Sequence, residues 1–313
     1  MKHSLLNRKV KTVLENPKVI LIKFLLLISP LLDDRTYLKL LFPLRTGYRL
    51  DLKNPQTYNQ KLQWLKLNYR KPIMTKMVDK YEAKAIVKDA IGEEYVVKNY
   101  GVWNSFDEID FDLLPDKFVL KTTHDQGGVV ICKDKSTFDF VAAKKKLNFH
   151  LKRKHFYLSR EWPYKNVTPR ILAEEYLDIG EEDLKDYKYY CFNGIPKIMF
   201  VSSNRNSGNP NIDFFDMNFQ QLDIIRANGP SKKKIDKPIN FYFMEELSRK
   251  LSDSFPHVRI DFYEVNGNVL FGEFTFFSAG GLKPFHPEKW DYIFGEWIDL
   301  DSIVNKRLKI EKL

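Results

Sequence analysis

The chain has 313 residues, 43% of them hydrophobic and 14% aromatic, so it is long enough to bury a sizeable core, and global disorder is excluded. Lysine and arginine number 51 against 41 aspartate and glutamate, a net charge of +10 that favours polyanionic partners without choosing among them. Cys132 and Cys191 lie in separate apolar runs, which indicates neither a disulfide framework nor a zinc site. We therefore expect a protein of about two lobes in a reducing cytoplasm.

Residues 1–70 are predicted to be mainly helical, and the last of these helices runs from Tyr58 to Asn68. The most hydrophobic segment, Val19 to Pro30, is shorter than the roughly 20 apolar residues that a membrane-spanning helix needs. It follows a basic start, but Leu31-Leu32-Asp33-Asp34 is not a small-residue cleavage site, which disfavours a secretion signal. Two alternatives remain for residues 19–32: a buried helix, or an interfacial helix in peripheral contact with the inner face of the plasma membrane.

Helices and short strands alternate after this region. An amphipathic helix is predicted at 75–90 with Thr75 as its N-cap, a lysine-rich helix with a solvated face at 144–154, and a further helix at 244–255. Strands are predicted at 95–97, 118–121, 129–131, 170–177, 187–192 and 196–201, with a hairpin turn at Asn193-Gly194. The pattern is that of an α+β protein.

A second predicted hairpin, near the C-terminus, has carboxylates on both strands. Its turn is Asn266-Gly267, between runs rich in aromatic and β-branched residues. Because strand side chains alternate, one face is predicted to carry Arg259, Asp261 and Tyr263, and the partner strand Glu273 and Thr275. Hard oxygen ligands suit Mg²⁺ that carries nucleotide phosphates, and the guanidinium can hold a developing anion. The alternative is a surface hairpin with cross-strand ion pairs.

Residues 118–131 are predicted to form a strand, a glycine loop and a second strand. Backbone N–H groups in such a loop can approach phosphates, and Lys121 at the strand end can neutralise them. The glycine and lysine spacings of a P-loop or of a dinucleotide fingerprint are missing. The alternative is an ordinary hairpin with a Gly-Gly turn.

A third motif, Glu174-Glu175-Tyr176-Leu177, ends an apolar strand with adjacent acids. An extended backbone there can present N–H and C=O groups to a purine edge, and one carboxylate can accept from the adenine amino group. A charged strand end explains the motif equally well.

These motifs occur in the order expected of ATP-grasp proteins, and the chain resembles the TupA-like ATP-grasp family of cell-surface polysaccharide biosynthesis from about residue 35 to residue 300. The resemblance is carried by Asn54–Trp64, Val78–Tyr81, Gly101–Trp103, Phe118–Lys121, Ser159–Tyr164, Asp186–Lys188, Phe192–Gly194 and Gly272–Phe276. It implies an α+β ATP-grasp fold: two lobes of mainly antiparallel sheet that close over ATP, plus an N-terminal helical region. The implied division is 1–70 for the helical cap, 71–110 for a linker helix and first-lobe elements, 111–175 for a small lobe with a glycine-rich lid, and 176–313 for a large lobe with the metal hairpin.

The resemblance also implies roles for individual residues. Phosphate binding would fall to Lys80 and Lys121, under a lid formed by His124, Gln126, Gly127 and Gly128. Adenine would be held by Glu174, Glu175 and Leu177. Mg²⁺ would be bound by Asp261 and Glu273, with Thr275 in place of the asparagine that many ATP-grasp enzymes have there. Arg259 would stabilise the transferring phosphoryl group or the acyl-phosphate intermediate, and Lys188 would lie near the phosphates or the ribose. Candidate contacts for a sugar or carboxylate are Arg160, Trp162 and Tyr164.

The implied chemistry is ATP- and Mg²⁺-dependent amide formation through an acyl phosphate. The implied partners are an amino acid or other amine and a uronic-acid carboxylate, either of an acidic capsular or cell-wall glycan or of an acceptor linked to a nucleotide or lipid. No nucleic acid is expected, because a basic binding module leaves the acidic hairpin unexplained. The rival function is a glycosyltransferase using a nucleotide-sugar: Asp110-Phe111-Asp112 and Asp299-Leu300-Asp301 match its Asp-x-Asp pattern but lack the expected strand context.

Overall fold

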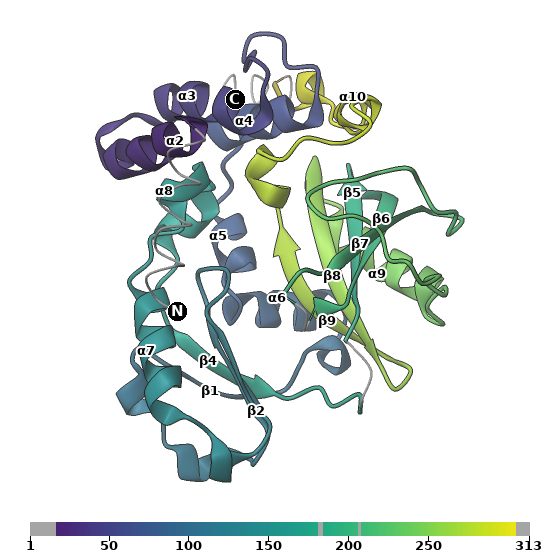
Figure 1. Ribbon diagram of the computed structural model, residues 1–313. Helices are drawn as coiled ribbons and strands as arrows, with labels where there is room; N and C mark the ends of the chain where they lie inside the picture. The colour runs from purple at the N-terminus through teal and green to yellow at the C-terminus, as the bar shows by residue number, and fades with distance from the viewer. Residues whose placement is uncertain (1–16, 181–183, 206–207, 305–313) are drawn as a thin grey trace, which may run out of the picture.

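The computed structural model describes residues 17–180, 184–205 and 208–304, and within them two antiparallel sheets are surrounded by helices (Figure 1). The first sheet has the order β1-β4-β2-β3 and consists of β1 (Asn99–Trp103), β2 (Phe118–Thr122), β3 (Val129–Cys132) and β4 (Ile171–Glu175). The second has the order β7-β6-β5-β8-β9 and consists of β5 (Asp186–Phe192), β6 (Ile195–Ser203), β7 (Asn211–Asp216), β8 (His257–Val265) and β9 (Asn268–Thr275). The predicted α+β class with mainly antiparallel sheets is confirmed.

The first sheet and helix α7 (Phe140–Leu151) form what we call the small lobe. Phe118 and Leu120 of β2 pack in one core with Leu147 of α7. Strand side chains alternate, so Lys121 lies on the opposite face of β2. Glu174 lies on that same face, because the register pairs Val119 with Glu174. One face of the small lobe is thus apolar and covered by α7, and the other carries charge.

The second sheet forms the large lobe with five helices: α4 (Tyr58–Asn68), α5 (Ile73–Val78), α6 (Glu82–Ile91), α9 (Phe241–Ser252) and α10 (Lys289–Glu296). The predicted helix at 58–68 is confirmed, and its start is fixed by a capping box between Thr57 and Gln60. The helix predicted at 244–255 begins at Phe241, because Phe241 and Met244 are both fully buried. Both predicted hairpin turns are present, with Asn193, Gly194, Asn266 and Gly267 all at positive φ.

The predicted continuous helix at 75–90 is wrong, since the chain breaks between α5 and α6. Thr75 lies inside α5 and caps nothing. The break is made by Asp79, whose Oδ1 accepts from the backbone N–H of Tyr81 at 2.9 Å and of Glu82 at 3.4 Å. The N–H of Lys80 then donates to the carbonyl of Thr123 at 3.2 Å. This hydrogen bond connects the turn that carries Lys80 to the small lobe.

The strand predicted at 95–97 is also wrong. Gly92, at φ +126°, ends α6 and is followed by a 3₁₀ turn at Glu93–Tyr95, and the strand begins only at Asn99. Tyr95 and Val96 pack against the core of the large lobe. The apolar signal of this segment therefore reports burial of a connection between the lobes and not membership of a sheet.

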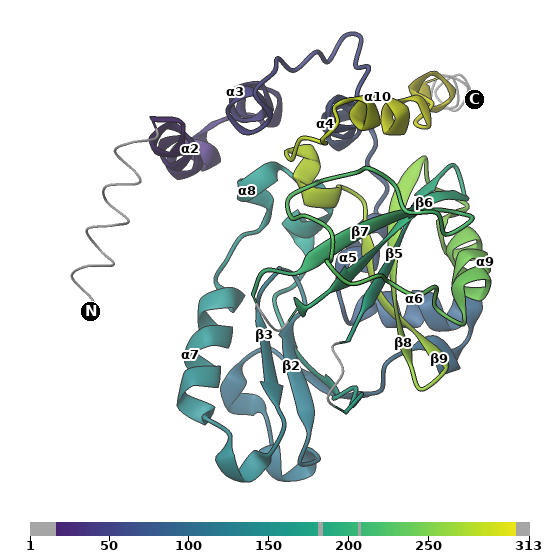
Figure 2. The same cartoon turned by 45° about the vertical axis from the view of Figure 1, so that its right-hand side comes forward.

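Two N-terminal helices, α2 (Pro17–Ile28) and α3 (Asp34–Thr46), lie apart from both sheets (Figure 2). Helix α3 begins where Asp33 accepts from the N–H of Thr36 and ends at Gly47, at φ +88°. Across the described parts of the chain, no helix combines the length and the apolar character needed to cross a bilayer.

The aromatic core of the large lobe contains a buried histidine that should make stability depend on pH. His257 Nδ1 donates to the carbonyl of Cys191 at 2.9 Å, so Nε2 is the acceptor for the Tyr58 hydroxyl at 2.8 Å. Burial lowers the pKa of His257 to about 3 from its ordinary 6.5. The unfolded chain therefore binds an extra proton between these values, and the free energy of unfolding falls as pH drops below 6.5.

We expect this residue to account for a loss of about 2 kcal/mol between pH 7 and pH 5. Urea unfolding of the natural protein and of His257→Gln at the two pH values measures it, because glutamine can keep both hydrogen bonds without titrating. If the two proteins lose stability in parallel, the assignment to His257 is wrong.

Candidate active site

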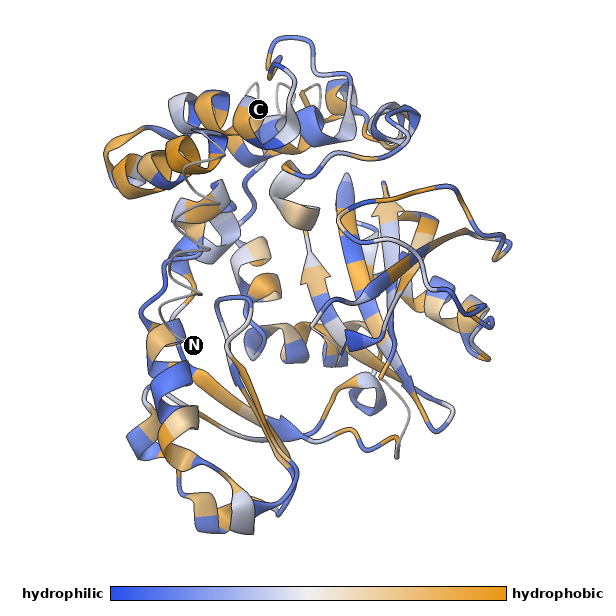
Figure 3. Cartoon of the chain, viewed as in Figure 1, coloured by the Kyte–Doolittle hydropathy of each residue, from blue (hydrophilic) through white to orange (hydrophobic). Residues whose placement is uncertain are grey.

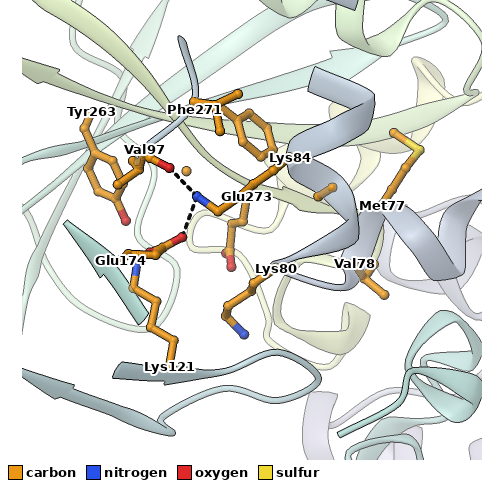
Figure 4. A pocket seen from close by; sticks show the side chains of 13 residues that line it. Met77, Val78, Lys80, Lys84, Val97, Lys121, Glu174, Tyr263, Phe271 and Glu273 are labelled. Carbon is orange, nitrogen blue, oxygen red and sulfur yellow. Dashed lines mark hydrogen bonds and ion pairs between the residues drawn. The ribbon is translucent and has the colours of Figure 1, made fainter. Parts of the chain in front are cut away.

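A partly enclosed pocket lies where the small lobe meets α6 and the β8–β9 hairpin (Figure 4). Three lysines and two glutamates share it with apolar side chains; the lining residues are Met77, Val78, Lys80, Ala83, Lys84, Val96, Val97, Lys121, Glu174, Tyr263, Phe271, Gly272 and Glu273. An apolar wall beside clustered cations suits a ligand with a flat ring at one end and negative charge at the other.

The β8–β9 hairpin brings together the residues that the sequence predicted there. The register places Arg259 opposite Thr275 and Asp261 opposite Glu273. The Arg259 guanidinium donates to Asp261 from Nε and Nη2, both at 2.7 Å. Nη2 also reaches Glu273 Oε1 and Thr275 Oγ1, each at 3.0 Å. One buried guanidinium therefore organises three oxygen-bearing side chains into a row.

A second set of hydrogen bonds fixes the orientation of the Arg259 side chain. Its Nη1 donates to Ser278 Oγ at 3.2 Å, and Ser278 Oγ lies 2.8 Å from the Tyr190 hydroxyl. The fully buried Arg226 donates to Tyr190 at 3.1 Å and to the carbonyl of Ser278 at 3.1 Å. The orientation of Arg259 is thus set by residues far apart in the sequence, none of which the motifs singled out.

Lys188 lies on β5 directly opposite Asp261 and forms ion pairs with Asp261 and with Asp186, the latter at 3.1 Å. Burial lowers the pKa of Lys188, but Asp186 and Asp261 outweigh it and the pKa is raised overall. Burial likewise raises the pKa of Asp261, and Arg259 with Lys188 reverses this and lowers it. Lys188 and Asp261 are therefore both charged at neutral pH.

The hairpin fits Mg²⁺ when nucleotide phosphates complete the coordination. Asp261 accepts from Arg259 at both carboxylate oxygens and from Lys188 at Oδ2, which leaves acceptor capacity on Oδ1, and the Glu273 side chain is 38% exposed and lines the pocket. Residues 17–180, 184–205 and 208–304 contain no group of three or more histidine, cysteine or acidic side chains placed to hold a metal alone. Mg²⁺ commonly takes one or two carboxylates plus substrate phosphates, which matches this donor set.

Opposite the hairpin, Glu174 is held between two lysines. Lys84 Nζ lies 2.7 Å from one carboxylate oxygen, Lys121 forms an ion pair with the other, and Lys84 also donates to the carbonyl of Val97 at 2.6 Å. Burial raises the pKa of Glu174, but the two lysines dominate and lower it to about 2. Glu174 is thus a carboxylate that positions two cations at the pocket. Glu175 is exposed and Leu177 half-buried, so their predicted roles beside adenine remain predictions.

Lys80 reaches from the break between α5 and α6 to the glycine loop. Its Nζ donates to the carbonyls of Thr122 at 3.1 Å and Asp125 at 2.5 Å. Burial lowers the pKa of Lys80 against the opposing effect of Glu273 and Asp125. The side chain borders the pocket (Figure 4) and is anchored to the loop. Lys80 therefore links the pocket to the glycine loop through these two hydrogen bonds.

The loop at 122–128 is built around a buried Asp125, which contacts Thr122 Oγ1 and His150 Nδ1. Gly128 is required there, because a Cβ atom would lie 1.9 Å from Thr122 Oγ1. Of the predicted lid residues, Gln126 and Gly127 are exposed, whereas His124 is buried with Nε2 at 3.0 Å from the carbonyl of Arg153. The His124 imidazole therefore faces α7 and not the pocket.

The three predicted substrate contacts separate in the structure. Arg160 is 2% exposed and binds Asp34 Oδ1 at 3.0 Å and the carbonyl of Ser29 at 2.5 Å, so it anchors the N-terminal helices and is not brought to the pocket. Trp162 is buried in the core of the large lobe. Tyr164 alone borders the hairpin: burial is the main cause that raises its pKa well above the ordinary value, and the charges of Glu161 and Glu273 add to it.

Sequence reasoning missed Lys84 as a residue of the site. Lys84 follows Lys80 by four residues, a spacing that could have suggested a shared face. This signal is an ordinary charge pattern, which only the partner Glu174 in the small lobe distinguishes from a solvated helix face. Asp186 is two residues before Lys188, and their shared strand face indicates an ion pair, which the structure shows at 3.1 Å.

Lysines from β2 of the small lobe and from the α5–α6 segment of the large lobe surround one pocket with an acidic hairpin, an arrangement for holding a nucleoside triphosphate between two α+β lobes; proteins built so form the ATP-grasp class of ATP-dependent ligases. Residues 60–299 match the model of the family described as TupA-like ATPgrasp. The chain belongs to that family, and the predicted resemblance is confirmed.

Solved structures with distant similarity include D-alanine–D-alanine ligase from Helicobacter pylori, 14% identical, TM-score 0.44, covering 79% of this chain and 70% of that one. The Bacillus anthracis D-alanine–D-alanine ligase complexed with ATP is 15% identical, TM-score 0.41, covering 85% and 78%. L-amino acid ligase from Bacillus licheniformis is 12% identical, TM-score 0.41, covering 71% and 49%. A comparison with curated proteins gives no match.

Proposed function

We propose that the protein is an ATP- and Mg²⁺-dependent carboxylate–amine ligase that joins an amino acid or other amine to a uronic-acid carboxylate of a surface polysaccharide. The observation that carries the proposal is the Arg259 guanidinium, which binds Asp261, Glu273 and Thr275 beside a pocket with three lysines. Membership of the TupA-like ATP-grasp family supports the ligase class. The glycan acceptor follows from the resemblance of the motifs to proteins of polysaccharide biosynthesis.

The reaction has two steps. A carboxylate oxygen of the acceptor attacks the γ-phosphorus of ATP, the bond from that phosphorus to the bridging oxygen breaks, and ADP leaves. The amine nitrogen then attacks the acyl carbon, a carbon–nitrogen bond forms, phosphate leaves with the electrons of the carbon–oxygen bond, and the amine loses a proton. No protein nucleophile is needed, so the contribution of the chain is positioning and charge neutralisation.

Different residues of the pocket supply the positioning and the charge neutralisation. Phosphate charge is neutralised by Lys121, from β2 of the small lobe, and by Lys80 and Lys84, from the α5–α6 segment of the large lobe. Arg259 holds negative charge that develops on the transferring phosphoryl group, and its rigid support keeps it in place before the reaction. Asp261 and Glu273 would hold Mg²⁺, which supplies further neutralisation of the phosphate oxygens when bound.

Hydroxylamine trapping tests this function. The purified protein is incubated with MgATP, a hexuronate or a short oligouronide, and excess hydroxylamine, which converts an acyl phosphate into a stable hydroxamate. We expect hydroxamate and ADP to form in equal amounts and to depend on Mg²⁺. The Asp261→Asn/Glu273→Gln double variant should lose both products by a factor of about 100 or more, whereas Glu246→Gln, a change at an exposed ion pair on α9, should not.

The assay separates the rival functions. ADP without hydroxamate would indicate phosphorylation of a sugar hydroxyl and would contradict the proposed ligase function. Release of a nucleoside diphosphate from a nucleotide-sugar, with no turnover of ATP, would support the glycosyltransferase function in place of the ligase function.

A further inference from the structure

Helix α2 carries an apolar stripe that the rest of the described chain leaves uncovered. The exposed fractions along it are 42% for Ile20, 58% for Phe24, 77% for Leu27 and 84% for Leu31 in the turn that follows. These residues are spaced by three or four positions, so they lie along one side of the helix. Figure 3 shows α2 as a hydrophobic segment at the periphery of the molecule.

The opposite side of α2 is fixed to the protein. Leu25 is buried in a core with α3, and Ser29 Oγ donates to the carbonyl of Tyr157 at 2.9 Å. Arg160 donates to Ser29 Oγ at 2.9 Å and to the carbonyl of Leu32 at 3.0 Å, and its guanidinium packs 4.2 Å from the ring centroid of Tyr37. The stripe is therefore held outward by a buried ionic anchor.

Charge and length suit a lipid surface. Exposed basic side chains on α2 and the first turns of α3 are Lys18, Lys23, Arg35 and Lys39; of the two acids there, Asp33 caps α3 and Asp34 is paired with Arg70 and Arg160. The sequence before α2 adds Lys2, Arg8, Lys9 and Lys11. The helix has 12 residues, a length of about 18 Å, which is too short to cross the hydrocarbon core but fits a helix lying flat on it.

We propose that α2 docks the protein on an anionic membrane surface, with Phe24, Leu27 and Leu31 inserted among the lipids and the lysines at the headgroups. A second copy of this chain is a poorer occupant, because it would bring like charges together. The inference does not depend on the ligase activity.

Vesicle sedimentation tests the proposal with the full-length protein. Phosphatidylcholine vesicles are compared with vesicles containing about 30 mol% phosphatidylglycerol. We expect binding to the anionic vesicles only, weakened by salt and reduced about tenfold or more in Phe24→Glu/Leu27→Glu. The control Leu113→Glu/Val141→Glu makes the same charge change at residues 82% and 80% exposed elsewhere, and should bind almost as the natural protein does.

A fluorescent probe identifies what covers the stripe. Cys132 and Cys191 are both buried, so an environment-sensitive thiol label on Leu27→Cys reports mainly on α2. Its emission should shift to the blue on anionic vesicles, and a label on Val141→Cys should not respond. A blue-shifted Leu27 probe without lipid would show that the protein itself or a second copy covers the stripe, and would overturn the proposal. Failure to sediment, or equal loss of binding in both double variants, would overturn it too.

Discussion

Replacing Arg259 with lysine is expected to lower kcat by a factor of about 100 while the affinity for MgATP changes far less. A lysine keeps the positive charge, so Asp261 and Glu273 are not left as uncompensated buried carboxylates. It cannot reproduce the guanidinium fork that binds Asp261 through two nitrogens and reaches Glu273 and Thr275 as well. The loss should therefore appear in the chemical step and not in binding.

Single-turnover ADP release and calorimetric titration of MgATP separate these effects, and thermal unfolding verifies that the variant is folded. Arg259→Ala should be as inactive and also less stable, because it leaves the buried Asp261 with Lys188 alone and Glu273 without its ion-pair partner. A lysine variant that keeps kcat within about threefold would show that Arg259 only stabilises the hairpin and does not stabilise the transition state.

Replacing Lys84 with methionine should raise the dissociation constant of ATP by a factor of about 10 to 100, the effect of losing one charged contact to a phosphate. The matched control is Lys88→Met, one turn further along α6. Lys88 pairs with Glu93 at the surface, where the two side chains are 52% and 75% exposed, so its loss should change affinity less than about twofold. Calorimetry on the two variants gives the comparison directly.

The competing explanation is that Lys84 serves only to neutralise Glu174. In that case Lys84→Met would lower the melting temperature and leave ATP affinity unchanged, since Lys121 also pairs with Glu174. Unchanged affinity with reduced stability would therefore exclude Lys84 as a phosphate contact.

Much of the local architecture could be predicted from neighbouring residues. Asn266-Gly267 specifies a tight turn because both positions take positive φ, and this turn sets the pairing from Val265 with Asn268 to Phe262 with Phe271. A register shift between Asp261 and Phe262 then brings Asp261 opposite Glu273, where the turn register alone would pair it with Gly272. Thr57 and Gln60 specify the start of α4 through reciprocal hydrogen bonds. Each of these features depends on residues within one turn or one hairpin, so the information is contained in the local pattern.

What the sequence by itself determined is therefore the α+β class, the start of α4, the two hairpin turns and the family. Only the tertiary structure decided which charged groups reach the pocket. Lys84 and Arg160 are both basic residues in helical or turn segments, yet one lines the pocket and the other is buried against Ser29 and Asp34. A charged side chain binds ligand or anchors the fold according to which group, distant in the sequence, buries it and pairs with it. Such a pairing between distant residues produces no periodic or local pattern in the sequence.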